Sequence, residues 1–273
     1  MAVARKVEPW TGSVRDRALS AFRDAHAGRE LAPVVALIAA LDEEESLGRV
    51  IAEVPSEACG LRVDTLVIDD GSSDGTSEVA ERAGAFVCRL ERNLGHGIAL
   101  RAGYRLAADF GVPYIVTLDA DGQWNPTELE GVLEPVVAGE ADFVIGSRVL
   151  GATETDDAFR QQGVHVFAWL TRLLTGVKVT DTSSGFRALR TEVTQRVRQE
   201  QVQYQTSELL IGAIAAGFQI AERPIVMRKR FAGESRKGRN WIYGWRYCQV
   251  VLRTAWRERR ALASRRFARG QRV

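Results

Sequence analysis

The chain has 273 residues, of which 45% are hydrophobic, so it can form one large α/β domain or two small ones with a real core. The net charge of +2 conceals an uneven distribution: residues 223–273 carry 16 Lys and Arg against two acids, net +14, and residues 1–222 carry net −12. A basic tail on an acidic body indicates an anionic partner such as phosphates, anionic lipid or nucleic acid.

The cysteines and the apolar runs argue against several protein classes. Cys59, Cys88 and Cys248 are widely spaced and form no Cys-x-x-Cys motif, so neither a zinc site nor a disulfide framework is indicated. The longest apolar run covers residues 34–41, far short of the ~20 residues that a membrane-spanning helix needs. Residues 1–30 lack the apolar core of a signal peptide. These features predict a cytoplasmic protein without a membrane span.

Residues 1–30 mix charged and small side chains, and we expect a peripheral extension with a short helix near residues 15–27. Apolar runs typical of buried strands then alternate with helical segments. This alternation predicts an α/β domain with a parallel, doubly wound sheet, right-handed crossovers and helices on both faces. We expect strands at residues 34–41, 65–68, 85–90, 114–118 and 142–145, and helices at residues 42–54, 76–83, 127–137 and in a segment ending at residue 110.

The regular alternation ends after Arg148. We expect a mobile acidic loop at residues 151–157, a polar turn at residues 181–187 and a basic amphipathic helix at residues 241–260. Further helices are expected at residues 164–174 and 206–216, and a strand at residues 218–226. The predicted organisation is an extension at residues 1–30, a main domain with a mostly parallel sheet at residues 31–237, and a basic helix and tail at residues 238–273.

The most informative stretch covers residues 114–126, where an apolar strand is followed by Asp119 and Asp121. Asn125 and Pro126 then start a helix, so both carboxylates lie at the carboxyl end of a strand, where open parallel sheets bind ligands. With Gln123 as a further oxygen donor, they can hold Mg²⁺ or Mn²⁺, whose shell diphosphate and water would complete. The alternative is an ordinary turn rich in Asp and Gly.

Two other loops also follow predicted strands. Asp69 and Asp70 can accept hydrogen bonds from a nucleobase or a ribose, and two adjacent acids exceed what one helix cap needs. Asn93, Gly95 and Gly97 precede a helix, where backbone amides favour an anion. A tight loop without a ligand explains these glycines equally well.

Five motifs occur in a fixed order, and together they resemble the family 2 glycosyltransferases of the GT-A fold. The most similar branch is that of the dolichol- and polyprenyl-phosphate mannosyl- or glucosyltransferases, and the match covers about residues 33–237. The motifs are Asp69-Asp70-Gly71-Ser72-Ser73-Asp74-Gly75-Thr76, Asn93-Leu94-Gly95-His96-Gly97-Ile98-Ala99, Asp119-Ala120-Asp121-Gly122-Gln123, Gly146-Ser147-Arg148 and Asp181-Thr182-Ser183-Ser184-Gly185-Phe186-Arg187.

The resemblance implies an inverting transfer of a sugar from a GDP- or UDP-linked donor, with polyprenyl phosphate as the favoured acceptor. It implies Mn²⁺ or Mg²⁺ as cofactor, with Asp121 as the principal ligand and Asp119 and Gln123 beside it. It further implies that Arg148 and Arg160 neutralise phosphate. The positions that we assign to donor binding are Glu43, Asp69, Asp70, Gly97 and Asp119.

The first motif of the family is only partly present. Family members usually read Pro-x-Tyr-Asn-Glu where this chain has Ala39-Ala40-Leu41-Asp42-Glu43. The tyrosine normally lies near the nucleotide, so the identity of the base stays open. Glu43 remains, and the metal and diphosphate positions persist.

A general base is needed only for some acceptors. Inverting transfer to a hydroxyl needs one, and Asp181 and Glu208 are the candidates, whereas a phosphate acceptor is already an anion. Glu208 is equally well explained as a negative charge in the first turn of a helix.

The basic segment at residues 228–237 resembles the Arg…Gly-x-Ser-Lys segment that family members place near the acceptor and the diphosphate. Arg228, Arg230 and Ser235 are therefore predicted to bind phosphate, in a flap that closes on substrate. A solvated run of charge is the alternative. In residues 241–260, one predicted helical face is apolar and includes Trp241 and Trp245, so it either packs on the core or lies on an anionic membrane.

The favoured function is sugar transfer to a polyprenyl phosphate by an enzyme that is cytoplasmic or peripheral on the inner face of the membrane. One alternative is a soluble family 2 transferase that acts on a hydroxyl of a small molecule or glycan. The other is a non-catalytic nucleotide- or nucleic-acid-binding module, but the paired acids would repel phosphate unless a metal intervened. We therefore expect no nucleic-acid partner.

Overall fold

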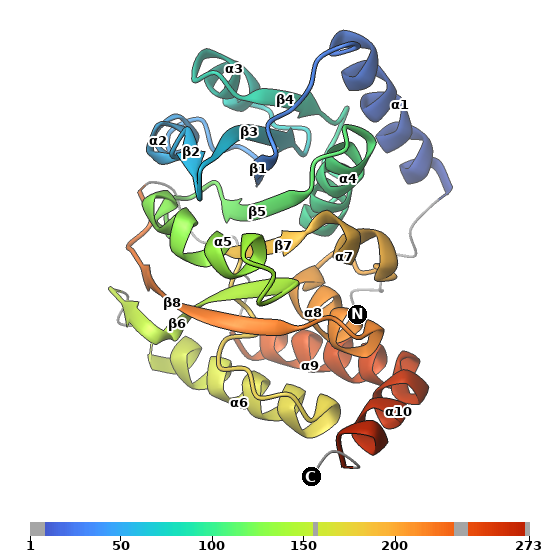
Figure 1. Cartoon of the computed structure of the whole chain (residues 1–273). Coiled ribbons are helices and arrows are strands. Elements are labelled where there is room, and N and C mark those ends of the chain that lie inside the picture. The colour runs from blue at the N-terminus through green and yellow to red at the C-terminus, as the bar shows by residue number, and fades with distance from the viewer. Residues whose placement is uncertain (1–8, 155–157, 232–239, 271–273) are drawn as a thin grey trace.

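The computed structural model describes residues 9–154, 158–231 and 240–270, and a mixed β-sheet forms its centre (Figure 1). Within these residues the strand order is β4-β3-β1-β5-β7-β6-β8, and a short β2 pairs antiparallel with β3. The strands are β1 (Val34–Ala40), β2 (Glu57–Ala58), β3 (Leu61–Asp69), β4 (Phe86–Arg89), β5 (Tyr114–Asp119), β6 (Phe143–Thr153), β7 (Arg187–Arg190) and β8 (Ile220–Met227).

The helices form a layer on each face of this sheet. On one side lie α1 (Pro9–Ala25), α4 (His96–Asp109), α7 (Thr191–Arg196) and α8 (Gln205–Ala216), and α6 (Ala158–Thr175), α9 (Asn240–Arg257) and α10 (Arg259–Gly270) pack against α8. On the other face lie α2 (Leu47–Glu53), α3 (Thr76–Arg82), the 3₁₀ segment η1 (Pro126–Glu128) and α5 (Leu129–Val137). This arrangement confirms the predicted α/β class with helices on both faces.

Strand β1 shows why the central apolar runs form strands. Each of its residues is buried, and its side chains alternate between the two hydrophobic cores. Val35 and Leu37 join the core that includes α4 and α8, whereas Ala36 and Ile38 join the core that includes α2 and α5.

The sheet is mostly parallel, as predicted, and strand β7 is an antiparallel member that the sequence did not indicate. It lies between β5 and β6 and runs antiparallel to both, while β1, β3, β4 and β5 are mutually parallel, as are β6 and β8. Its four residues begin and end with arginine, so the sequence offers no apolar run that would mark it as a central strand.

Three segment boundaries differ from those expected. The helix predicted from residue 42 begins only at Leu47, because Asp42 has a left-handed backbone (φ 49°) and its N–H donates to Ser72. The loop expected at residues 151–157 is strand β6 as far as Thr153, and residues 155–157 lie outside the described part. The helix expected at residues 241–260 is divided into α9 and α10 at Glu258.

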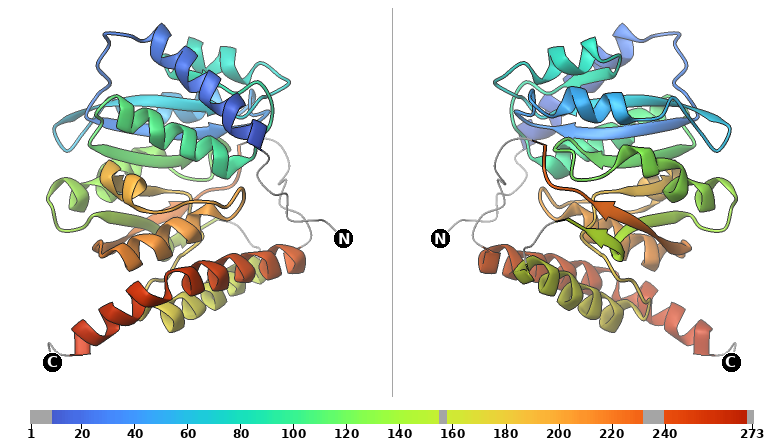
Figure 2. Two further views of the ribbon diagram at one scale, coloured as in Figure 1. Left: turned by 90° about the vertical axis from the view of Figure 1, so that its right-hand side faces the viewer. Right: turned by 90° about the vertical axis from the view of Figure 1, so that its left-hand side faces the viewer.

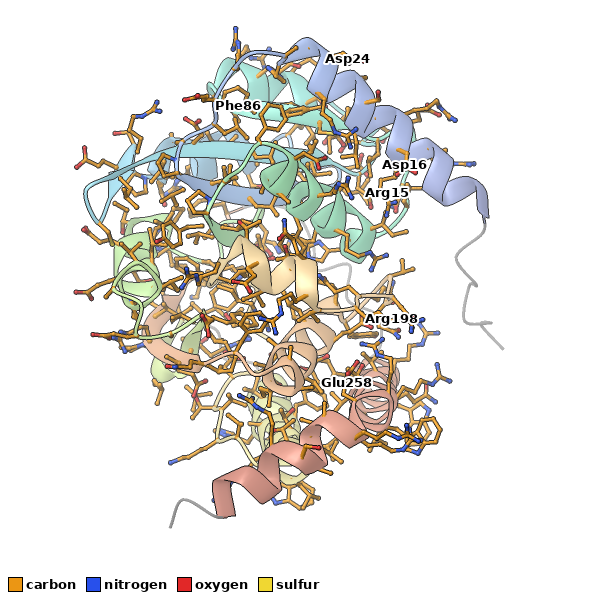
Figure 3. All side chains as sticks on the ribbon, turned by 45° about the vertical axis from the view of Figure 1, so that its right-hand side comes forward. Arg15, Asp16, Asp24, Phe86, Arg198 and Glu258 are labelled. Carbon is orange, nitrogen blue, oxygen red and sulfur yellow. The ribbon has the colours of Figure 1, made fainter. Side chains whose placement is uncertain are left out.

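Helix α1 belongs to the packed structure and is longer than the helix expected near residues 15–27. Its side chains Val14, Leu19 and Phe22 are buried in the core that also contains α4. His26, just beyond the helix, contacts the Phe86 ring at a centroid distance of 5.2 Å, and Figure 3 shows Phe86 next to α1.

Helices α6, α9 and α10 form a further layer that packs on α8 and shares its hydrophobic core. Figure 2 shows α6, α9 and α10 below the sheet, with α8 between them and the strands. No helix in the described ranges is both long enough and apolar enough to cross a membrane.

Candidate functional site

The predicted site loops meet at one edge of the sheet. In the strand register, Ala40 of β1 pairs with Asp69 of β3, and Ala39 pairs with Asp119 of β5. The loops after these three parallel strands therefore lie side by side at their carboxyl ends, as predicted.

The loop with the two acids is held by its own hydrogen bonds. Trp124 Nε1 donates to Asp119 Oδ2 at 2.7 Å, and the Gln123 N–H donates to Asp121 Oδ1 at 3.0 Å. Gly185 packs against the Asp119 carboxylate so closely that a Cβ there would lie 2.6 Å from Oδ1. The site thus needs glycine at position 185, and Asp121 and Gln123 are both buried in it.

A segment from the other end of the domain covers this loop. We call residues 227–231 the strap. The Arg228 N–H donates to the Gln123 carbonyl at 2.7 Å, and the Phe231 N–H donates to the Asp121 carbonyl at 3.0 Å. The Phe231 ring lies on Gly122, where a Cβ would be 2.2 Å from the ring.

The strap brings a cation to the acids. Arg230 Nη2 lies 2.7 Å from Asp121 Oδ2, and its Nη1 lies 3.5 Å from Glu43 Oε1. Glu43 is oriented by Ser46, whose hydroxyl donates to Oε2 at 2.8 Å. Three residues predicted for the site, Glu43, Asp121 and Arg230, are therefore in contact, and phosphate binding by Arg230 stays a prediction.

The donor set fits a small divalent ion. Among the described residues no group of three His, Cys, Asp or Glu side chains is arranged for a metal, so this site offers two carboxylates, Asp119 and Asp121, and the amide of Gln123. Mg²⁺ and Mn²⁺ are commonly held by one or two carboxylates together with substrate phosphates and water. The guanidinium of Arg230 against Asp121 also shows that positive charge is stabilised at this position.

Asp69 and Asp70 hold loops in place. Asp69 Oδ1 accepts from the Ser72 N–H at 2.8 Å, and its Oδ2 accepts from the Ser77 hydroxyl. Asp70 accepts from the N–H groups of Leu94 and Gly95, both at 2.8 Å. Burial raises the pKa of Asp70 from 3.8 to about 6. Both acids thus stabilise the conformation of the loops, and their contact with a sugar donor stays a prediction.

Gly97 also has a structural role. Its N–H donates to the Val202 carbonyl at 2.9 Å, and a Cβ would lie 2.5 Å from the Gln201 carbonyl oxygen. The close approach that this glycine permits is therefore to residues 201–202. Of the two interpretations of this loop, the tight turn is the one that its contacts support.

Arg148 and Asp181 form a buried pair. Arg148 donates through Nε to Asp181 Oδ2 at 2.6 Å and through Nη2 to Oδ1 at 3.1 Å. The same Nη2 donates to the Ser183 hydroxyl at 3.0 Å, and the guanidinium lies 5.1 Å from the Trp124 ring centre. Asp181 is fully buried, so it positions Arg148 beside the acid loop and is not placed as a base facing solvent.

Glu208 is fully buried, and its partners belong to the protein. Its Oε2 accepts from the N–H groups of Glu200 and Gln201, and its Oε1 lies 2.8 Å from Arg257 Nη1. Figure 3 marks this region by Arg198, whose carbonyl accepts from Arg257 at 2.9 Å. The helix-terminus interpretation therefore describes Glu208 better than a role as base.

The remaining phosphate-binding candidates are not assembled at the acids. Arg228 pairs with Glu53 at 2.7 Å. The side chain of Arg160 and the whole of Ser235 lie outside the described residues, as does the rest of the predicted flap, residues 232–237.

Sequence reasoning gave no role to two residues that shape the site. Trp124 holds Asp119, as described, and its position directly after the acid motif was the available signal. Arg187 is fully buried and donates to the carbonyls of Ser184 at 2.7 Å and Thr182 at 2.8 Å. Burial lowers the pKa of Arg187, and these carbonyls fix the turn that carries Gly185.

Comparison with known proteins agrees with this geometry. The chain is 35% identical over 195 residues to a dolichyl-phosphate hexose transferase of Haloferax volcanii, which covers 71% of this chain and 82% of the relative. It is 32% identical over 233 residues to a polyprenol monophosphomannose synthase of Mycolicibacterium smegmatis, covering 81% and 87%.

A solved structure of low sequence identity has the same fold. Glucosyl-3-phosphoglycerate synthase from Mycobacterium tuberculosis, in complex with Mn²⁺, uridine diphosphate and glucosyl-3-phosphoglycerate, matches with a TM-score of 0.66 at 21% identity, covering 87% of this chain and 84% of that one. A family model described as glycosyl transferase family 2 matches residues 35–198. The chain therefore belongs to glycosyl transferase family 2 and is a glycosyltransferase with a GT-A-like fold.

Proposed function

We propose that the protein transfers a hexose from a nucleotide-diphosphate sugar to a polyprenyl phosphate, with inversion at the anomeric carbon. The donor is GDP- or UDP-linked. The observation that carries the proposal is the pair of strand-end acids, Asp119 and Asp121, with the cationic strap residue Arg230 across them. The named relatives from Haloferax volcanii and Mycolicibacterium smegmatis support the lipid-phosphate acceptor.

The donor diphosphate would lie over the acid loop. A divalent ion held by Asp119, Asp121 and Gln123 would act there as a Lewis acid on the leaving diphosphate. Arg230 can move from Asp121 toward the diphosphate, and Arg148, held by Asp181, adds a second fixed positive charge. Such preorganised charges stabilise the negative charge that develops on the leaving group.

The acceptor supplies its own nucleophile. A phosphate oxygen attacks the anomeric carbon on the face opposite the diphosphate, the bond from that carbon to the donor oxygen breaks, and the nucleotide diphosphate leaves. No proton has to be removed from an ionised phosphate. This agrees with Asp181 and Glu208, the candidate bases, being held by Arg148 and Arg257.

A donor and acceptor panel tests the proposal. Radiolabelled UDP-glucose, UDP-N-acetylglucosamine and GDP-mannose are each incubated with polyprenyl phosphate and Mn²⁺ or Mg²⁺. We expect label from one donor to enter an organic-extractable product that mild acid hydrolyses. Label that enters a water-soluble hydroxyl acceptor, and never the lipid, would instead establish the soluble transferase.

The place of action follows from the acceptor. A polyprenyl phosphate keeps its head group at the bilayer surface, so the enzyme has to work there. We propose the cytoplasmic surface, where nucleotide sugars are available as donors. When cells that express the tagged chain are fractionated, we expect the protein in the membrane fraction. A wash with high salt should release it from these membranes.

A further inference from the structure

Exposed apolar side chains are concentrated on two neighbouring helices. Among the described residues eight large hydrophobic side chains are exposed, and six of them belong to α6 and α9. They include Trp169, Trp245 and Trp256, which are 63%, 61% and 69% exposed. The other three are Val166, Leu173 and Leu252. We call these six residues the apolar face.

The apolar face is additional to the stripe that packs on the core. Phe167 of α6 stacks on Tyr247 of α9 at a ring distance of 4.0 Å, and both rings are buried. Val251 and Thr254 of α9 are also buried. Each helix thus has one apolar stripe turned inward and a second one turned to solvent. Of the two alternatives for the face with Trp245, packing on the core is the one that its exposure contradicts.

The two outward stripes form one surface. The parallel contacts of Phe167 with Gly244 and Tyr247 place α6 beside α9, and Figure 2 shows the two helices together in the lower layer. Near their C-terminal ends lies a groove of about 810 Å³. Its lining includes Leu174, Leu252, Trp256 and Leu262 from three helices.

The charge around this surface is mostly positive, and Glu258, between α9 and α10, is paired with Arg257. Helices α6, α9 and α10 contain ten arginines and no aspartate or glutamate. Of those whose side chains the structure describes, five are exposed, namely Arg172, Arg246, Arg253, Arg259 and Arg260. Others face inward, since Arg257 pairs with Glu208 and Arg265 donates to the last carbonyls of α8.

We propose that the apolar face docks on an anionic lipid bilayer, with the tryptophans in the interface and the exposed arginines against the head groups. This inference rests on the proposed function and specifies the surface that it requires. Tryptophan favours the membrane interface, and each arginine near anionic lipid adds about 1 kcal/mol of attraction, roughly fivefold in affinity.

Charge argues for a bilayer over a second copy of the chain. A symmetric dimer through this face would bring its arginines against the same arginines, with no acid on these helices to compensate. A bilayer surface offers negative charge beside apolar chains. In Figure 1, α6 begins on the side of the sheet where β8 ends, so docking would place that edge, and with it the acid loop, beside the bilayer.

Vesicle flotation of the full chain tests the docking surface. Vesicles of phosphatidylcholine and phosphatidylglycerol should bind the protein at low salt. Binding should be lost at high salt, and vesicles of pure phosphatidylcholine should not bind it. The triple variant Trp169→Ser, Trp245→Ser, Trp256→Ser should bind about tenfold more weakly or worse. Brominated lipids should quench tryptophan fluorescence in the native chain more than in this variant.

A charge-matched pair of variants isolates the electrostatic part. Arg172→Gln, Arg253→Gln, Arg259→Gln together should weaken vesicle binding about 100-fold. The control Arg29→Gln, Arg62→Gln, Arg82→Gln removes the same charge from other exposed positions and should change it less than about threefold. Equal weakening by both triples would overturn the proposed surface.

Activity separates the two proposals. The tryptophan variant should lose transfer to polyprenyl phosphate in vesicles and keep transfer to a short, water-soluble prenyl phosphate. A native enzyme that glycosylates the lipid but does not bind vesicles would overturn the docking and leave the function standing. Vesicle binding without any transfer would do the reverse. A dimer in ultracentrifugation that the tryptophan variant dissociates would assign the face to a second copy.

Discussion

Each oxygen of the Asp121 carboxylate has a different partner, and this division explains its place in the site. Oδ1 accepts the Gln123 N–H within the loop, and Oδ2 faces the cation of Arg230. A carboxamide at this position would keep the first contact and lose the charge that the second one needs. Replacing Asp121 by asparagine therefore removes the negative charge while keeping the shape of the side chain.

Asp121→Asn should abolish metal-dependent transfer while the fold persists. We expect the rate to fall at least about 100-fold, because an electrostatic contact to the leaving group is lost. Mn²⁺ binding in the presence of nucleotide, measured by calorimetry, should weaken in parallel. Glu57→Gln, an exposed acid on β2, is the control. Unchanged turnover of Asp121→Asn in EDTA would contradict the assigned role.

Asp70 should make stability depend on pH. Its pKa is about 6 in the folded state and near 3.8 when exposed, so the folded state holds the proton more tightly. Stability is therefore lost as pH rises from about 4 to 6, by up to about 3 kcal/mol from this residue. In urea unfolding, the difference in unfolding free energy between the native chain and Asp70→Asn should shrink as the pH rises across this range. An advantage that grows with pH would refute the assignment.

The sequence predicted which acids lie at the site but not what they touch. Asp119, Asp121 and Glu43 follow strands, and the rule that strand ends meet at one edge was sufficient to group them. Their partners come from distant segments: Arg230 is more than a hundred residues from Asp121. Such pairings depend on packing that no local pattern encodes.

The strap is the element that decides access to the acid loop. Two backbone hydrogen bonds join it to the carbonyls of Asp121 and Gln123, and the Phe231 ring packs on Gly122. Residues 228–231 of the strap are the described part of the predicted phosphate-binding flap, and they lie over the loop that carries Asp121. Arg230 there competes with any second cation for Asp121.

Arg230→Gln should therefore tighten metal binding and slow transfer. Two unit charges about 4 Å apart interact by about 4 kcal/mol near a protein surface, and relief of a third of this energy gives about tenfold. Electron paramagnetic resonance of free Mn²⁺ measures this without nucleotide. Lys229→Gln, an exposed neighbour, should change the affinity less than about twofold. Weaker Mn²⁺ binding by Arg230→Gln would show that the arginine supports the ion.

Helix α9 is tied to α8 through Arg257 and Glu208, and this pair distinguishes an anchor from a base. Glu208→Gln should cost about 2–3 kcal/mol of unfolding free energy, because the partly buried Arg257 loses the only one of its carboxylate partners that is fully buried among the described residues. Transfer by the folded fraction should stay within about threefold, whereas loss of a base costs about 100-fold or more.

Arg257→Gln is the matched variant for this pair. It should destabilise the chain similarly, and the double variant should cost clearly less than the two single effects added together, because they share one contact. A folded Glu208→Gln enzyme without activity would restore Glu208 as a catalytic candidate.

Elements with strong periodic patterns were predictable, and short or polar ones were not. β1 and β5 are apolar runs and appeared as expected, as did α8 with Gly217 at its end. β7 was missed because two of its four residues are arginine. Its place in the sheet is set by the partners β5 and β6, which only the assembled fold supplies.

At the scale of the whole molecule, the segments predicted as extension, main domain and tail share one continuous hydrophobic core. Leu19 of α1, Leu37 of β1 and Val251 of α9 belong to the same buried cluster. The charge division between a body of −12 and a C-terminal part of +14 therefore crosses a single packed structure. The charge distribution indicates which partners each surface can bind, whereas the apolar contacts define the unit that folds together.

This continuity predicts that the chain unfolds in one step and needs its C-terminal helices. Deleting residues 241–273 removes Tyr247 and Val251, which are fully buried, and exposes the apolar side chains of α8 that they cover. Losing two such side chains alone costs several kcal/mol, a large part of the roughly 5–15 kcal/mol that stabilises a domain. Calorimetry should show a single transition for the native chain and none for the truncated one. A truncated chain that melts cooperatively at the native temperature would instead establish residues 241–273 as an independent appendage.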